Sequence, residues 1–324
     1  MSRFAPGIAL AALLAAVATL VSSQYGGPQF LYALLFGMAF NFLAPHAALR
    51  EGIQFTARTI LRLGVGLLGA RIAWGEIASL GVAPALLIVV CVAATIGFGA
   101  WAARALRRPA AEGVLTGGAV AICGASAALA IAAVLPRTER SSHYTLITVV
   151  GVTALSTLAM IVYPIAVPLL GMGDAAAGIF LGGTIHDVAQ VVGAGYMISP
   201  EAGITATYVK LLRVMLLVPV VLALSLAYRQ GAPARTSLLP PWFLIVFIAL
   251  LAVNSAGAIP PAANEALAIV SRACLVAAIA ALGVMTSFGE LAALGWRPIA
   301  LLGAETAFLA VLVVGGLRFL GVGA

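Results

Sequence analysis

The chain has 324 residues, of which 63% are hydrophobic and only 8% are charged. Soluble globular domains carry about 25% charged residues, so the composition excludes one and predicts a multi-pass membrane protein. The formal net charge is +7, but the basic residues stand mostly between apolar runs and do not interleave with aromatic residues. They are therefore interpreted as topology signals, and nucleic acid is not an expected partner.

Apolar runs of about 17 to 25 residues, long enough to span a bilayer, recur along the whole chain. They lie at 7–23, 29–45, 53–71, 82–104, 113–135, 144–171, 176–198, 203–228, 240–256, 262–285 and 297–320. The first run is interpreted as a retained helix, because it is long for a signal peptide and lacks a clear cleavage site. We predict an all-α polytopic membrane protein with about 9–11 transmembrane segments in one transporter domain, residues 1–324.

The distribution of arginine predicts a cytoplasmic N-terminus. If every segment crosses, the cytoplasmic arginines are Arg3, Arg50, Arg104, Arg107, Arg108, Arg229, Arg235 and Arg297, and the outer ones are Arg71, Arg137, Arg140 and Arg318. Arg137 and Arg140 fit poorly outside, and the misfit disappears if segments 113–135 and 176–198 each leave on the side they entered. We predict that these two segments are discontinuous or re-entrant helices, with plain spans as the alternative.

An internal repeat aligns residues 57–87 with residues 271–301 at a constant offset of 214. The matches include Arg58 with Arg272, Gly69 with Gly283, Gly75-Glu76 with Gly289-Glu290, and Pro84 with Pro298. The copies begin at the third and tenth segments, an odd separation that gives them opposite orientations. This pattern predicts the inverted repeat of secondary transporters, whose sites lie near the midplane at discontinuous helices.

Segment 113–135 reads GVLTGGAVAICGASAALAIAAVL. A break in this segment would aim free backbone N–H groups and the N-terminus of a half-helix at an anion. The candidate substrate-binding residues are Thr116, Gly117, Gly118, Cys123, Gly124 and Ser126. The alternative is a helix of small residues that lets its neighbours pack closely.

Segment 176–198 carries GGTIHDVAQ at membrane depth, beginning at Gly182. A charged side chain there costs on the order of 3 kcal/mol, which indicates a functional site. The candidate substrate-binding residues in this segment are Gly182, Gly183, Thr184 and Gln190. His186 can change its charge near neutral pH and is predicted to couple proton movement to transport, with Asp187 setting its protonation. A structural His–Asp pair is the alternative.

The other charges within the apolar segments are Arg58, Arg62, Lys210, Arg213, Arg272 and Glu305. Cations outnumber carboxylates, which favours an anionic substrate, although Arg62 and Lys210 have snorkelling toward the interface as an alternative. No metal site is expected, because His46 and His143 lie near segment ends and the three cysteines lack ligand spacing. Their odd number also argues against a disulfide framework.

Four stretches resemble a known family: RLGVGLLGARI (62–72), LTGGAVAICGASA (115–127), GGTIHDVAQVVGAG (182–195) and VKLLRVMLLVP (209–219). They are similar to the YeiH-type sulfate-exporter family of conserved hypothetical proteins of the bacterial inner membrane. The resemblance covers nearly the whole chain. It implies a relation to the cation:proton antiporter and bile-acid-transporter fold group, and hence inverted repeats, discontinuous helices and alternating access.

The predicted function is secondary active export of a small anion of the sulfate, sulfite or sulfonate type, held between the two broken segments. Alternatives are a Na+- or H+-coupled transporter of organic anions and, from other classes, an anion channel or an intramembrane enzyme. No enzyme is expected, because no nucleophile or metal set accompanies His186 and Asp187. The expected partners are the anion and bilayer lipid, with a homodimer left open, and no cofactor is expected besides coupling H+ or Na+.

Overall fold

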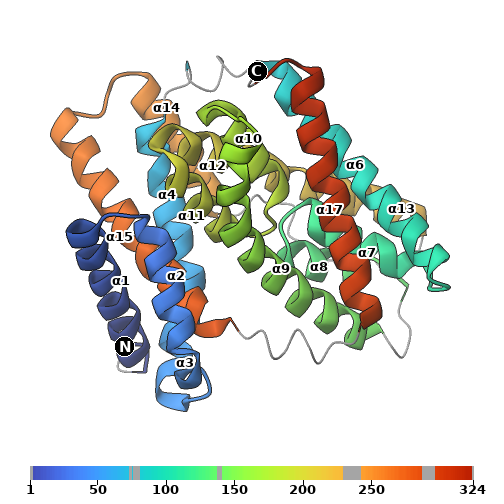
Figure 1. Cartoon of the computed structure of the whole chain (residues 1–324), viewed down its shortest axis with the longest axis horizontal. Coiled ribbons are helices and arrows are strands. Elements are labelled where there is room, and N and C mark those ends of the chain that lie inside the picture. The colour runs from blue at the N-terminus through green and yellow to red at the C-terminus, as the bar shows by residue number, and fades with distance from the viewer. Residues whose placement is uncertain are drawn as a thin grey trace.

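The computed structural model describes residues 3–72, 75, 81–136, 141–228, 242–286 and 296–322. All of its described elements are helices (Figure 1), which confirms the all-α membrane fold. Among them, six stretches are long and apolar enough to cross a bilayer: α1 (Ala5–Tyr25), α6 (Val82–Ala105), α9 (Ser141–Leu169), α12 with α13 (Pro200–Tyr228), α15 (Pro261–Met285) and α17 (Trp296–Phe319). Shorter apolar helices are α2 (Gln29–Ala39), α11 (Val188–Ile198) and α14 (Trp242–Ser255).

Several predicted segments contain more than one helix. Segment 53–71 is the end of α3 (Ala47–Phe55), a π-helical turn (Thr56–Ile60), α4 (Leu61–Leu68) and a 3-10 turn (Gly69–Arg71). Segment 113–135 contains most of α7 (Ala110–Ala121) and α8 (Ala125–Ala132), and segment 176–198 contains α10 (Asp174–Thr184) and α11. Both predicted discontinuities are therefore confirmed, whereas re-entry stays a prediction.

The helices form two groups that lie side by side in Figure 1. The first group contains α1 to α4, α14 and α15, and the second contains α6 to α13 and α17. α12 (Pro200–Met215) lies inside the second group against α10 and α11, and it continues into α13 (Leu217–Tyr228) after Leu216. α11 also packs against α2 and α15, so this helix joins the second group to the first.

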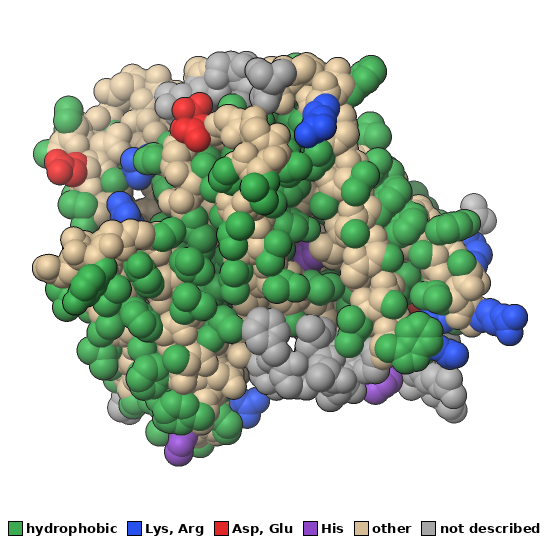
Figure 2. Space-filling model, viewed as in Figure 1, with side chains coloured by type: hydrophobic (Ala, Val, Ile, Leu, Met, Phe, Trp, Pro, Cys, Tyr) green, Lys and Arg blue, Asp and Glu red, His purple; other side chains and the backbone are tan. Residues whose placement is uncertain are grey.

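The space-filling view shows hydrophobic side chains over most of the visible face (Figure 2), while most visible charged side chains lie toward its margins. Large apolar side chains are exposed on long helices, including Leu86, Trp101, Ile165 and Val311. A surface of this kind is stable against lipid hydrocarbon rather than water.

The repeated stretches lie partly outside the described residues, and so do Glu76, Glu290, Arg137 and Arg140. Within the described parts, Gly69 and Gly283 have a similar role. A Cβ at Gly69 would overlap the carbonyl oxygen of Phe247 in α14, and a Cβ at Gly283 would overlap that of Leu34 in α2. The inverted repeat itself stays a prediction.

The contact between α6 and α7 depends on two facing glycines. A Cβ on Gly113 would overlap the carbonyl oxygen of Gly99, and backbone cannot move aside as a flexible side chain can. Gly113→Val is therefore expected to push the helices apart and destabilise the fold by about 3 kcal/mol, which would lower the apparent melting temperature in detergent. The matched control is Gly303→Ala, because a Cβ at Gly303 has open space. Equal melting temperatures for the two variants would contradict this packing.

Candidate functional site

The site begins at the two helix breaks. α7 ends at Ala121 and α8 starts after Gly124, whose φ of 63° and ψ of −125° are strained for any residue with a side chain. α10 ends at Thr184, and Asp187 begins α11 as its N-cap in an extended conformation. Each break therefore exposes the C-terminus of one half-helix and the N-terminus of the next.

The two breaks meet in space. A Cβ built on Gly124 would lie 3.6 Å from the Cβ of His186 and 3.7 Å from its carbonyl oxygen. The ring Nδ1 of His186 is also 3.1 Å from the carbonyl oxygen of Val120, at the end of α7. Segments 66 residues apart thus bring their helix ends to one place.

Lys210 of α12 lies between the breaks and is fully buried. Its ammonium donates hydrogen bonds to the carbonyl oxygens of Ile122 (2.7 Å), Ile185 (3.0 Å) and His186. One side chain therefore caps both half-helices. Snorkelling, the alternative considered for this lysine, is wrong, because the positive charge stays inside and is stabilised by the negative ends of α7 and α10.

Arg213, one turn further along α12, has the same role. Its Nε donates to the carbonyl oxygen of Ala121 (2.7 Å) and its Nη2 to that of Val120 (2.8 Å). Its Nη1 donates to the carbonyl oxygens of Gly182 (2.9 Å) and Ile185 (3.0 Å). The planar fork thus donates to four acceptors on the two half-helices, one more than the three donors of an ammonium could bind.

The two Gly-Gly pairs are not the breaks themselves. Gly117 and Gly118 lie within α7, and Gly182 and Gly183 lie within α10, all buried. A Cβ at Gly182 would overlap the Ala206 carbonyl oxygen of α12. The prediction that these pairs expose unwound backbone to a ligand is wrong in this structure, because the pairs serve close helix packing and the chain unwinds a few residues later.

His186 and Asp187 have different partners. The Nε2 of His186 is 3.1 Å from Thr306 Oγ1 of α17. The Asp187 carboxylate accepts a hydrogen bond from the Ala189 N–H (3.0 Å), and the Asp187 N–H donates to Ser156 Oγ (3.0 Å). Asp187 is thus the N-cap of α11, and proton coupling by the two residues stays a prediction.

The remaining polar candidates lie around the breaks with varied contacts. Thr116 donates to Glu305 Oε1 (2.6 Å), and Glu305 Oε2 is buried without a partner among the described residues. Gln190 donates to Thr157 Oγ1 (2.7 Å), and its own Oε1 is likewise buried and unpartnered. Each of these oxygens is a buried acceptor with no donor within hydrogen-bond reach among the described residues.

The smaller candidates behave differently. Thr184 bonds back to the Phe180 carbonyl oxygen within its own helix (2.6 Å), and Cys123 is buried in the first break. Ser126 is exposed in the first turn of α8, with its hydroxyl 3.4 Å from the Cys123 carbonyl oxygen. Of these three, Ser126 is the one available to a ligand beside the N-terminus of α8.

The other predicted cations belong to the first helix group and are exposed. Arg62 lies within electrostatic range of the Asp187 carboxylate across the two groups. The Nε of Arg272 donates to Gln29 Oε1 (2.9 Å). Arg58 is exposed on the π-helical turn, a position consistent with snorkelling.

The sequence reasoning missed several residues at the breaks. Ser156 and Thr157 are adjacent polar residues inside the apolar run of α9, and Thr306 follows Glu305 in α17. These three residues could have been identified as candidates, because polar side chains at membrane depth indicate a functional site. The carbonyl groups bound by Lys210 and Arg213 left no such signal.

This architecture defines the chain as a multi-pass membrane protein with two discontinuous helices whose breaks adjoin. Residues 6–302 match the model of the family described as Conserved hypothetical protein 698, and the chain belongs to this family. No solved structure matches it.

Similar proteins are named as UPF0324 membrane proteins. CT0845 of Chlorobaculum tepidum is 52% identical over 97% of this chain and 89% of its own length. TauZ of Paracoccus denitrificans is 52% identical over 98% of this chain and 95% of its own length. RB0971 of Rhizobium meliloti is 49% identical over 99% and 94%. These names describe membrane proteins and state no substrate.

Proposed function

We propose that this protein is a secondary transporter that exports a small anion of the sulfate, sulfite or sulfonate type across the bacterial inner membrane. The observation that carries the proposal is the meeting of two helix breaks beside Lys210 and Arg213, close to the middle of the Pro200–Tyr228 span. Irregular backbone at membrane depth is tolerated where it lines a site or a cavity. Discontinuous helices near the midplane are the sites of secondary transporters.

The charges at the four helix ends favour a negatively charged substrate. Lys210 and Arg213 offset the negative C-termini of α7 and α10, which leaves the positive N-termini of α8 and α11. Asp187 already caps α11, whereas the first turn of α8 has exposed Ser126 and no acidic residue. The N-terminus of α8 is therefore the end that favours an anion.

The test is flux into proteoliposomes containing the purified protein. Labelled sulfate, sulfite and methanesulfonate should enter with saturable kinetics and respond to an imposed pH or Na+ gradient. Flux that rises linearly with concentration and ignores both gradients would identify an anion channel instead. If none of the three anions moves, the proposed substrate class is wrong.

Proton coupling is proposed to involve Asp187 with His186. Asn is as good an N-cap as Asp, so Asp187→Asn should keep the N-cap bond to Ala189 while removing the charge. We expect an unchanged melting temperature and a loss of the response of flux to a pH gradient. Asp187→Ala, which also loses the cap, should be less stable by about 1 kcal/mol. Normal gradient response in Asp187→Asn would rule out this carboxylate as the coupling group, leaving the buried Glu305 to be tested in the same way.

The proposed orientation places the N-terminus in the cytoplasm. Single cysteines introduced at Arg104 and Arg137 should then be labelled from the same face of the membrane if segment 113–135 re-enters. Labelling from opposite faces would mean that this segment crosses.

A further inference from the structure

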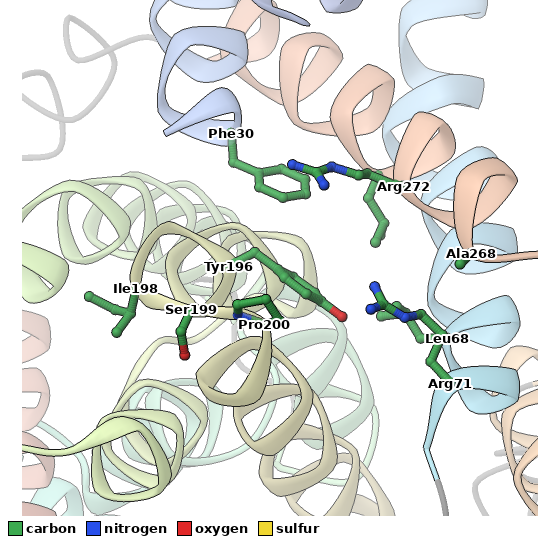
Figure 3. Close-up of a pocket in the computed structure, with 10 residues that line it drawn as sticks. Phe30, Leu68, Arg71, Tyr196, Ile198, Ser199, Pro200, Ala268 and Arg272 are labelled. Carbon is green, nitrogen blue, oxygen red and sulfur yellow. The ribbon is translucent and has the colours of Figure 1, made fainter. Parts of the chain in front are cut away.

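A cavity of about 250 Å³ lies between the two helix groups (Figure 3), and none of the residues of the helix breaks lines it. The first group contributes residues from α2, α4, the following 3-10 turn and α15, and the second contributes the end of α11 and the start of α12. Its lining consists of Phe30, Leu68, Arg71, Tyr196, Ile198, Ser199, Pro200, Ala268, Arg272 and Leu275. The cavity is large enough for a small organic or inorganic ion.

The charge in this cavity is of one sign. Arg71 and Arg272 both line it, and no acidic residue is among the lining residues. The Nε of Arg272 donates to Gln29, and its two Nη groups make no hydrogen bond or ion pair with the described residues. In Figure 3 the Arg272 guanidinium lies beside the Phe30 ring and the Arg71 guanidinium lies beside Tyr196. Both positive charges therefore line one cavity without a carboxylate among its lining residues, which favours an anion there.

Tyr196 supplies an independent observation. Its hydroxyl oxygen is buried and has no hydrogen-bond partner among the described residues. Figure 3 shows that this hydroxyl points into the space beside the Arg71 side chain, on the side that faces α15. The hydroxyl of a buried tyrosine is normally hydrogen-bonded. The position of this hydroxyl therefore indicates that it donates to an acceptor atom of a ligand.

The N-terminus of α12 adds to the same field. Ser199 is the N-cap of α12, and its Oγ accepts a hydrogen bond from the N–H of Ala202 (3.1 Å). Pro200 is the first residue of the helix. The positive end of a sixteen-residue helix therefore opens at this cavity. An apolar part of the wall is formed by Phe30, Leu68 and Leu275, from the same first helix group as the two arginines.

We propose that Arg71, Arg272 and Tyr196 bind one compact oxyanion, of the sulfate or sulfonate type, at the interface between the two helix groups. The guanidinium groups match the oxygen atoms of such an anion, and the apolar wall accommodates a short alkyl chain. The arginines belong to the first group and the tyrosine to the second, so the bound anion joins the groups. Its role as a station on the transport path rests on the proposed function, whereas its binding does not.

Binding is tested on the purified full-length protein in detergent. Sodium sulfate and sodium ethanesulfonate are titrated at constant ionic strength against sodium chloride, with thermal stabilisation and calorimetry as readouts. Saturable binding by at least one oxyanion, beyond chloride, is expected. The absence of any effect beyond chloride would overturn the proposal.

Variants locate the site. Arg71→Gln and Arg272→Gln should each weaken binding by about tenfold or more, and Tyr196→Phe by roughly threefold. Arg104→Gln, at an exposed position near the end of α6, is the matched control and should bind as the unaltered protein does. Tyr196→Phe removes only an unpartnered hydroxyl, so it also serves if an arginine variant fails to fold. Unaltered affinity in Tyr196→Phe and in each folded arginine variant would overturn the assignment.

The oxyanion site and the proposed transport function would be rejected by different results. Oxyanion binding that depends on Arg71 and Arg272, together with no flux in proteoliposomes, would keep the site and reject transport. Normal flux in both arginine variants would keep transport and reject this cavity as a station on its path.

Discussion

Arg213→Met is expected to destabilise the protein by on the order of 3–5 kcal/mol. Methionine has a similar length but no donors, so the substitution removes four hydrogen bonds from Arg213. The carbonyl groups of Ala121 and Gly182 would then lose their side-chain donor inside the second helix group, where water does not replace it. The carbonyl groups of Ile185 and Val120 would keep only Lys210 and the His186 ring nitrogen as partners. The negative ends of α7 and α10 would also keep only the Lys210 ammonium between them, in place of two cations.

The measurement is the apparent melting temperature of detergent-purified protein, together with its elution as a single species. A drop on the order of 10 °C is expected for a loss of this size. Arg213→Lys should restore only part of it, because an ammonium cannot span four carbonyl groups in two directions. Arg318→Met, exposed near the end of α17, is the control. A melting temperature for Arg213→Met equal to that control would mean that the guanidinium does not hold the breaks together.

Lys210→Met is expected to have the largest effect on transport. The Lys210 ammonium is bound to carbonyl groups on both breaks at once, Ile122 on one side and Ile185 and His186 on the other. Without it Arg213 alone joins the two breaks, and we expect them to shift relative to each other. A displacement of about 1 Å at a binding site can cost about a hundredfold in rate, and a fall of that order in flux is expected.

Flux must be compared per amount of folded, reconstituted protein, because the variant also loses stability. Lys210→Arg should not rescue it, since Lys210 is fully buried and the larger guanidinium would overpack the site. The informative outcome is a folded Lys210→Met protein with very low flux. A folded variant that transports at the normal rate would show that the ammonium is structural only.

In the sequence, the main argument for an anionic substrate was the excess of positive side chains at membrane depth. The structure changes which positive groups support that argument. Lys210 and Arg213 are bound to backbone carbonyl groups, so neither is free to bind an anion. The positive field that remains comes from the N-terminus of α8 and, at the group interface, from Arg71 and Arg272. The same sign is favoured, by Arg272 from the sequence argument together with Arg71 and the N-terminus of α8.

The fold was largely predictable from composition and periodicity. Apolar runs of sufficient length fixed the helices, because every backbone group in hydrocarbon must be paired within the segment. The two discontinuities were also predictable. His186 and Asp187 have no place in an uninterrupted lipid-facing helix, and Arg137 and Arg140 fit poorly on the outer face if segment 113–135 crosses. The positions of the breaks were not, because Gly-Gly can mark either an unwound turn or a close helix contact.

The sequence by itself therefore determined the membrane class, the apolar segments and which two of them are interrupted. Only the tertiary structure decided that Lys210 and Arg213 cap both breaks, that His186 and Asp187 bind different partners, and that Arg71, Arg272 and Tyr196 share a cavity. The physical reason is that a sequence records which side chains can donate, whereas their acceptors here are backbone carbonyls. Every residue has that group, so only the packing of distant segments shows which carbonyls are left unpaired and which cation reaches them.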